Sequence, residues 1–222
     1  MIRSFQVLNA EATGPAKGMA HPGFFYLDAR GLIREKFFEA NELDRFTPNS
    51  VLGSLFPELA EEVGQEVEAP HLRVRLAQSD LIAVPGSRLT LLAEVELPAG
   101  LHVYAPPVKG YKPIELMTEA APQFTFHPAV YPKPKVLYLE AIRERVPVFE
   151  GKFRIRQDLT VTAAQDFLRA LGEGKMIEIG GELRYQACDQ RTCYPPTSVP
   201  VKWQLNVLPL DRQRSAEDIR HK

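Results

Sequence analysis

From residue 71 onward, turn signals separate short runs of alternating polar and apolar residues, and this pattern constrains the fold more than any other feature. Residues 71–76 alternate strictly, and residues 88–97 form a longer run of the same kind. Successive side chains of a strand point to opposite faces, so each run can bury one face. Short strands at this spacing predict a mainly β fold, a β-sandwich. Further strands are expected at 101–104, 114–118, 123–127, 145–149, 152–162, 176–186 and 197–207.

The chain before this β region has a mixed α and β pattern. Two apolar runs, at 24–27 and 32–38, flank a turn that contains glycine, which predicts a hairpin. Thr47 is expected to cap a helix whose first residue is Pro48. The apolar stripe of this predicted helix consists of Val51, Leu52, Leu55, Phe56 and Leu59.

An acidic stretch that ends in Pro70 marks the expected boundary between two domains. We therefore divide the chain into a first segment of residues 1–67, a β-sandwich of residues 68–210 and a charged tail of residues 211–222. The sandwich is expected to contain one helical interruption, at 163–171. Its strands are expected to bury Trp203, Phe124 and Phe126 in the core.

The charge balance argues against nucleic acid as a partner, because 27 basic and 28 acidic residues leave a net charge of −1 and imply no basic face. No apolar run approaches the length of a membrane span, so direct membrane insertion is not expected. The first residues lack the apolar core of a signal peptide. The protein is thus expected to be cytoplasmic or a piece of a longer exported precursor.

The chain contains two cysteines, Cys188 and Cys193, inside a polar turn between two predicted strands. Two thiols this close can form a disulfide with little backbone movement, so the pair is a candidate two-electron redox switch. A bridge closing so short a loop would contribute roughly 2 kcal/mol by chain entropy, which makes it a weak staple. The spacing itself is not specific, and a passive structural bridge fits equally well. Without a nearby histidine, the pair offers too few ligands for zinc, and no metal is expected.

Four side chains beside the cysteines are candidates for tuning the site. Arg191 lies between them and would lower a thiol pKa, whereas Asp189 would act in the opposite direction. Tyr185 and Tyr194 flank the pair and are candidates for shielding the sulfurs from oxidants. His102 and His127 lie in alternating strands, where a solvent-facing or hydrogen-bonded histidine is the usual case.

The segments from Tyr185 to Cys188 and from Cys193 to Pro196 resemble the redox hairpin of the N-terminal domain of thiol:disulfide interchange protein DsbD. This resemblance covers about residues 70–208 and includes the strand that ends at Tyr104. It implies an immunoglobulin-like β-sandwich in the periplasm. It also implies that electrons pass from a membrane-embedded relay to thioredoxin-fold proteins, with the dithiol itself in place of a cofactor.

The same resemblance implies residue roles. Cys188 and Cys193 would be the redox pair, with Cys193 attacking the partner, and Tyr104 would lie near them. The loop that caps the disulfide in the family would correspond to residues 132–138, with Leu137 or Tyr138 as the capping side chain. The spacing between the cysteines is one residue shorter here than in the best-known members.

The first segment has a resemblance of its own. Its residues 2–5, 21–28 and 34–39 are similar to the C-terminal half of redoxins of the peroxiredoxin and thioredoxin class, in which the proline corresponding to Pro22 is cis. No cysteine precedes Cys188, so this half of a thioredoxin fold has no nucleophile of its own. Its half-sheet would leave an edge exposed. The segment must therefore pack on the sandwich, pair with another copy in a homodimer, or stay partly mobile.

These observations favour thiol–disulfide exchange with protein partners, as in a component of a protein-disulfide reductase system. The alternative from a different class is a non-catalytic β-sandwich interaction module with a structural hairpin disulfide.

Overall fold

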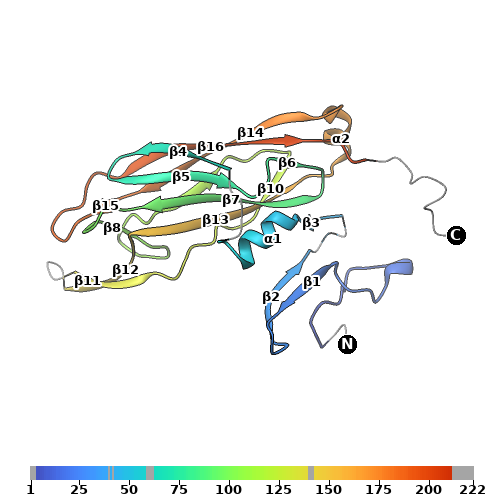
Figure 1. Ribbon diagram of the computed structural model, residues 1–222, viewed down its shortest axis with the longest axis horizontal. Coiled ribbons are helices and arrows are strands. Elements are labelled where there is room, and N and C mark those ends of the chain that lie inside the picture. Colours follow the sequence, from blue (N-terminus) through green and yellow to red (C-terminus); the bar gives the residue numbers. More distant parts are fainter. Residues whose placement is uncertain (1–3, 40, 42, 59–62, 140–142, 212–222) are drawn as a thin grey trace.

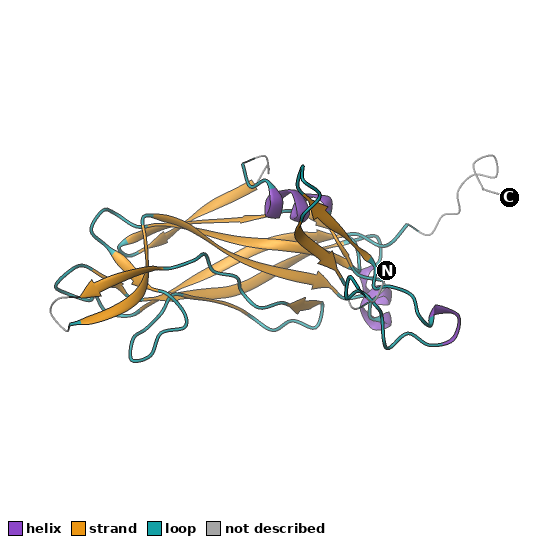
Figure 2. Ribbon diagram, turned by 90° about the horizontal axis from the view of Figure 1, so that it is seen from below, coloured by secondary structure: helices purple, strands orange, loops and turns teal. Residues whose placement is uncertain are grey.

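The protein is mainly β, as the alternating pattern predicts, in a computed structural model that describes residues 4–39, 41, 43–58, 63–139 and 143–211. Two long layers of strands run side by side along the molecule, and a separate hairpin lies at one end (Figure 1). Seen from below, the strands of the two layers stay close to parallel or antiparallel along the long axis (Figure 2). The predicted β-sandwich is therefore confirmed.

The larger layer is one sheet with the strand order β10-β13-β7-β5-β4, to which β3 adds by parallel pairing with β7. Its longest contact is the antiparallel β7–β13 pair, which extends over nine residue positions from Lys152↔Glu96 to Thr160↔Arg88. The strands are β3 (Arg45–Phe46), β4 (Val63–Ala69), β5 (Leu72–Gln78), β7 (Ser87–Glu96), β10 (Phe124–Phe126) and β13 (Lys152–Val161).

The opposite layer contains two four-stranded sheets. One has the order β6-β16-β14-β9, and the other, which carries the cysteines, has the order β11-β12-β8-β15. The first consists of β6 (Ile82–Ala83), β9 (Glu115–Thr118), β14 (Lys175–Tyr185) and β16 (Thr197–Val207). The second consists of β8 (His102–Tyr104), β11 (Lys135–Leu139), β12 (Glu144–Glu150) and β15 (Ala187–Cys188). A short helix, α2 (Gln165–Leu171), occupies the predicted interruption between β13 and β14.

The core lies between the layers and follows the alternation of the strands. In β16, every second residue from Val199 to Val207 is buried while its neighbours face outward, and β5 buries Leu72, Val74 and Leu76 against them. Trp203 is buried as expected, and its Nε1–H donates to the carbonyl oxygen of Ala77 at 2.9 Å. Phe124 is also buried, whereas Phe126 is partly buried at the edge of the same cluster.

The first segment forms the predicted hairpin and helix. β1 (Gly23–Leu27) pairs with β2 (Ile33–Phe38) in a two-stranded sheet, and a 3₁₀ turn (Gly14–Ala16) precedes them. α1 (Pro48–Leu55) begins with proline, and the Thr47 side chain accepts a hydrogen bond from the backbone N–H of Ser50. Leu59 of the predicted apolar stripe lies outside the described residues.

The resemblance of this segment to a redoxin implied a cis bond before Pro22, and this expectation is wrong. Among the described residues, the cis peptide bond joins Pro106 to Pro107 instead.

The predicted domain boundary after residue 67 falls inside β4, which pairs with β5 along its whole length. Within the described chain, no helix combines the length and the hydropathy that a membrane span requires.

A cluster of charged groups joins the first segment to the sandwich. The Arg88 guanidinium on β7 donates to both carboxylate oxygens of Glu39 at 3.0 and 3.2 Å, and to Asp158 Oδ2 on β13 at 3.0 Å. It also lies over the ring of Phe46, 4.3 Å from the centroid. Glu39 is buried, and this burial raises the pKa of its carboxyl. One cation thus compensates two carboxylates that come from both parts of the chain.

We predict that Arg88→Met destabilises the protein by about 2 kcal/mol, because it leaves Glu39 buried without its cation. The loss should stay below that of a fully buried pair, since Arg88 and Asp158 keep some solvent contact. Urea unfolding of both proteins measures the difference. Lys202→Met is the matched control: it removes an exposed ion pair with Glu178 and should change the unfolding free energy by less than about 0.5 kcal/mol. Equal stability of Arg88→Met and the parent protein would contradict the prediction.

Candidate redox site

The cysteines lie at the end of the molecule where β14 passes into β15 and the chain turns back into β16. An aspartate closes this turn. Asp189 Oδ1 accepts hydrogen bonds from the backbone N–H groups of Arg191 and Thr192, both at 2.7 Å, and the Asp189 N–H donates to the Thr192 carbonyl at 2.9 Å. The two backbone donors hold the pKa of the Asp189 carboxyl below its usual value. The loop between the cysteines is therefore ordered by its own side chain.

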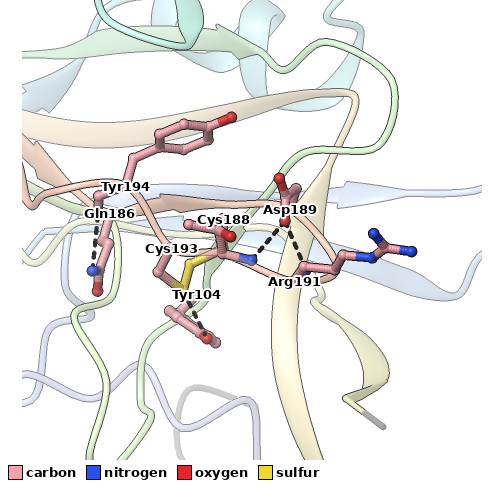
Figure 3. Close-up of a disulfide and its surroundings, with 8 residues drawn as sticks. Tyr104, Gln186, Cys188, Asp189, Arg191, Cys193 and Tyr194 are labelled. Carbon is pink, nitrogen blue, oxygen red and sulfur yellow. Dashed lines mark hydrogen bonds between the residues drawn. A yellow bond between two sulfur atoms is a disulfide. The ribbon is translucent and has the colours of Figure 1, made fainter. Parts of the chain in front are cut away.

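Cys188 and Cys193 form a disulfide with a Cα–Cα distance of 4.0 Å (Figure 3). The two sulfurs differ sharply in their surroundings. Cys188 is 1% exposed and packs in a small apolar cluster, whereas Cys193 is exposed at the surface. Attack on a disulfide needs access to one sulfur along the bond axis. The arrangement therefore favours attack at Cys193, with Cys188 as the leaving group.

Tyr104 lies directly beneath the exposed sulfur. Its hydroxyl is 3.6 Å from Cys193 Sγ, and its ring is buried, which raises the pKa of the phenol. The phenol thus stays protonated at neutral pH and is able to donate to a sulfur that carries negative charge. Tyr111 packs against Tyr104 with 4.4 Å between ring centroids and donates to Glu144 Oε2, a bond that raises the pKa of Tyr111 to about 12.

Tyr185 and Tyr194 hold the hairpin on the sandwich. Tyr185 belongs to the main core, where burial raises its pKa to about 12, and its hydroxyl donates to the Pro70 carbonyl at 2.7 Å. Tyr194 stacks on His71 with 3.9 Å between ring centroids, and its N–H donates to the Ala187 carbonyl. These contacts hold both ends of the cysteine loop in place, and they are made to Pro70, His71 and Ala187 rather than to the sulfurs.

Arg191 is exposed at the tip of the turn, and its side chain extends away from the disulfide (Figure 3). Among the described residues, its hydrogen bond runs from its backbone N–H to Asp189 rather than from its guanidinium to a sulfur. The structure therefore places its charge on the outside of the loop, away from the thiols.

Residues 135–138 of the stretch expected as a capping loop belong to strand β11 (Lys135–Leu139). β11 pairs with β12 from Lys135↔Val148 to Leu139↔Glu144, because its β-branched and aromatic residues suit an edge strand. Leu137 packs against the cluster that contains Tyr104 and Cys188, while Tyr138 is 52% exposed. Of the two predicted capping residues, Leu137 is the one on the disulfide side.

His102 is part of the site, although the sequence pattern suggested an ordinary histidine that is exposed or hydrogen-bonded. It lies directly opposite Cys188 in the β8–β15 pairing and is 2% exposed, and its Nε2 has no hydrogen-bond partner among the described residues. Burial lowers the pKa of its imidazole. The sequence contained one indication of this position. His102 lies two residues before Tyr104, and residues two apart share a face of a strand. No group of three or more metal-ligating side chains occurs in the described parts of the chain.

The family described as "Thiol:disulfide interchange protein DsbD, N-terminal" matches residues 73–203, more than half of the chain. The chain belongs to this family. Its β-sandwich is the immunoglobulin-like fold of the DsbD N-terminal domain, and the disulfide lies within the matched region. Membership and the Cys188–Cys193 disulfide together support thiol–disulfide exchange through the cysteine pair.

Two solved structures are similar to the chain, each at 15% sequence identity. One is the N-terminal periplasmic domain of ScsB from Proteus mirabilis, with a TM-score of 0.42, and the match covers 66% of this chain and 51% of that one. The other is the reduced DsbD N-terminal domain from Neisseria meningitidis, with a TM-score of 0.37 and coverage of 70% and 94%. The chain thus spans about half the length of the ScsB domain it matches. A search of curated proteins gives no match.

In the reduced protein, we predict that a maleimide or iodoacetamide reagent labels Cys193 at least about tenfold faster than Cys188, because only Cys193 reaches the surface. Quenched time points analysed by peptide mass spectrometry give both rates in one sample. Similar rates for the two thiols, under conditions in which the protein is folded, would contradict the assignment of distinct roles.

The stability of the oxidised protein should fall as the pH falls below about 6.5, the unfolded-state pKa of histidine. Because burial lowers the folded-state pKa of His102, the unfolded chain binds this proton first, and the free energy of unfolding decreases until the pH passes below the folded-state pKa. His102→Phe removes this proton and should flatten the pH dependence between pH 7 and 5. Urea unfolding at several pH values tests it, and parallel curves would refute it.

Proposed function

We propose that this chain is a thiol–disulfide exchange protein that passes reducing equivalents to thioredoxin-fold proteins through Cys193 and Cys188. The observation that carries the proposal is the asymmetry of the disulfide, with one sulfur exposed and the other buried within the same short hairpin. A sulfur that meets the partner and a second that resolves the intermediate are what a dithiol carrier requires. Family membership supports the same activity.

The exchange proceeds in two displacement steps. In the reduced protein, the Cys193 thiolate attacks one sulfur of the partner's disulfide, which forms a mixed disulfide and releases the partner's other sulfur as a thiolate. The Cys188 thiolate then attacks Cys193 Sγ, and the bond between Cys193 and the partner breaks. The partner leaves as a dithiol with two more electrons, and the Cys188–Cys193 disulfide forms again. A second thiol protein, or a membrane relay, must reduce it for the next cycle.

Tyr104 supports this chemistry by donating its hydroxyl hydrogen to Cys193. A hydrogen bond to the charged form of a group favours that form, so the phenol is placed to stabilise the Cys193 thiolate. The exposed position of Cys193 leaves the opposite side of the sulfur open to a partner. Leu137 and Tyr111 border the buried side and exclude water from the Cys188 side of the bond.

The proposal also includes the class of partner, the compartment and the pairing of the chain with a second copy. The partner is a thioredoxin-fold protein, because that fold carries an exposed disulfide of matching chemistry. The compartment is extracytoplasmic, as it is for the periplasmic domain of ScsB, and disulfides persist in such an oxidising environment. The hairpin of β1 and β2 has unpaired outer strand edges in the described structure, and its pairing with a second copy remains a prediction.

The competing function is an interaction module in which the disulfide is only a staple. The observation that favours it is the short separation of the cysteines, five residues, because a bridge of this kind also stabilises a hairpin without turnover. The reduction potential separates the two functions. Exchange predicts a value in the range of thioredoxin-like carriers, whereas a structural bridge predicts a value below about −300 mV.

Two serine variants test the proposed roles directly. Cys188→Ser should trap a stable mixed disulfide with a thioredoxin-fold partner, because Cys193 attacks and no second thiol resolves the intermediate. Cys193→Ser should form no such adduct while remaining folded by circular dichroism. Non-reducing electrophoresis and mass spectrometry detect the adduct. If Cys193→Ser unfolds the sandwich, or if neither variant forms the adduct, the staple explains the disulfide better.

A further inference from the structure

The buried nitrogen of His102 is a polar group that the oxidised structure leaves without a partner. Its Nε2 makes no hydrogen bond to any described residue, although the side chain is almost fully buried. A buried polar group in this condition is unfavourable, and native proteins rarely retain one without a use for it. A hydrogen-bond partner for this nitrogen is therefore expected in another state of the protein.

The strand register places Cys188 directly opposite His102. His102 on β8 is directly opposite Cys188 on β15, and opposed residues share one face of the sheet with their Cβ atoms about 4.5–5.5 Å apart. On its other side, His102 is opposite Glu150 of β12, whose carboxylate also binds Lys135. The ring packs edge-on against Tyr104 on the same strand, with 5.7 Å between centroids.

The redox state decides whether Cys188 can satisfy this nitrogen. In the disulfide, Cys188 Sγ is bonded to Cys193 and forms no hydrogen bond to His102. Reduction breaks that bond, frees the sulfur to rotate about its Cα–Cβ bond, and adds a proton to it. The resulting thiol is buried, where ionisation without a partner is strongly disfavoured. Cys188 must nevertheless become a thiolate to resolve a mixed disulfide.

We propose that His102 Nε2 accepts the proton of the Cys188 thiol in the reduced protein and thereby makes Cys188 the resolving thiolate. This role rests on the proposed exchange activity. The proton passes from Cys188 Sγ to Nε2, the thiolate attacks Cys193 Sγ, and the bond between Cys193 and the partner breaks. The partner's sulfur leaves as a thiolate, and the proton on Nε2 passes to it or to water. In the opposite direction, the imidazolium returns the proton to Cys188 as it leaves the disulfide.

The charges around the ring suit both forms of the imidazole. Burial keeps His102 neutral near pH 7, so its nitrogen is available as an acceptor. The carboxylates of Glu150 and Asp189 act in the opposite direction and favour the imidazolium once the proton arrives. The imidazolium is therefore stabilised from the strands to either side, by Glu150 on β12 and by Asp189 directly after β15, and the thiolate is paired with the imidazolium itself.

The pKa of Cys188 in the Cys193→Ser protein tests this role without any partner. We expect His102→Phe in this background to reduce the thiolate fraction at pH 7 at least about tenfold, as measured by thiolate absorbance near 240 nm against pH. His102→Gln, which keeps a polar side chain of similar size but cannot take a proton, should also reduce it. His127→Phe is the matched control, because His127 binds Thr160 on the opposite layer, and it should leave the titration unchanged.

The two-cysteine protein gives an independent readout. Because His102 stabilises the reduced state, His102→Phe should lower the equilibrium constant for reduction by glutathione about tenfold, or roughly 30 mV for a two-electron couple. An unchanged Cys188 titration in both His102 variants would overturn the proposal, and so would an equal shift in the His127 control. If His102→Phe fails to fold, His102→Gln decides the outcome. A shifted titration together with no adduct in the partner-trapping experiment would retain the His102 role and reject the exchange function.

Discussion

The pairing of β8 with β15 is the constraint on which the site depends. Two residues of β15 hydrogen-bond to the middle of the cysteine sheet, and this contact holds Cys188 on the strand while the chain turns outward at Asp189. Cys193 returns beside it in an isolated antiparallel bridge with Cys188, and it is exposed. A local bridge thus acquires a buried end and an exposed end, the asymmetry on which the proposed exchange function rests.

The rest of the molecule holds the short β8–β15 pair in place. The β14–β16 hairpin extends over eleven paired positions from Lys175 to Tyr185, and its far end carries the cysteine loop. Tyr185 and Tyr194 attach the base of the loop to Pro70 and His71 at the start of the sandwich. The first segment contacts the sandwich elsewhere. Its Glu39 binds Arg88 of β7, its strand β3 pairs with β7, and α1 follows β3 along the chain. The redox loop and the first segment therefore depend on separate contacts.

Local patterns predicted much of this fold, because they report on local forces. The alternation in β5 and β16, the cap at Thr47 and the helix at 163–171 each follow from side chains within a few residues of one another. The strand at 135–139 was not expected from the sequence, because β11 forms by pairing with β12, a partner that the local pattern does not specify. The position of the predicted domain boundary inside β4 has a similar cause, since pairing with β5 extends the sandwich into the first segment.

The sequence by itself predicted that the two thiols are able to meet, because a separation of five residues permits a disulfide, and that strands would flank them. Only the tertiary structure decided which sulfur is exposed, that Tyr104 lies against Cys193, and that His102 faces Cys188. These three facts depend on the register between strands that are more than eighty residues apart. Register is set by the packing of the whole sheet against the core, and no local pattern contains it.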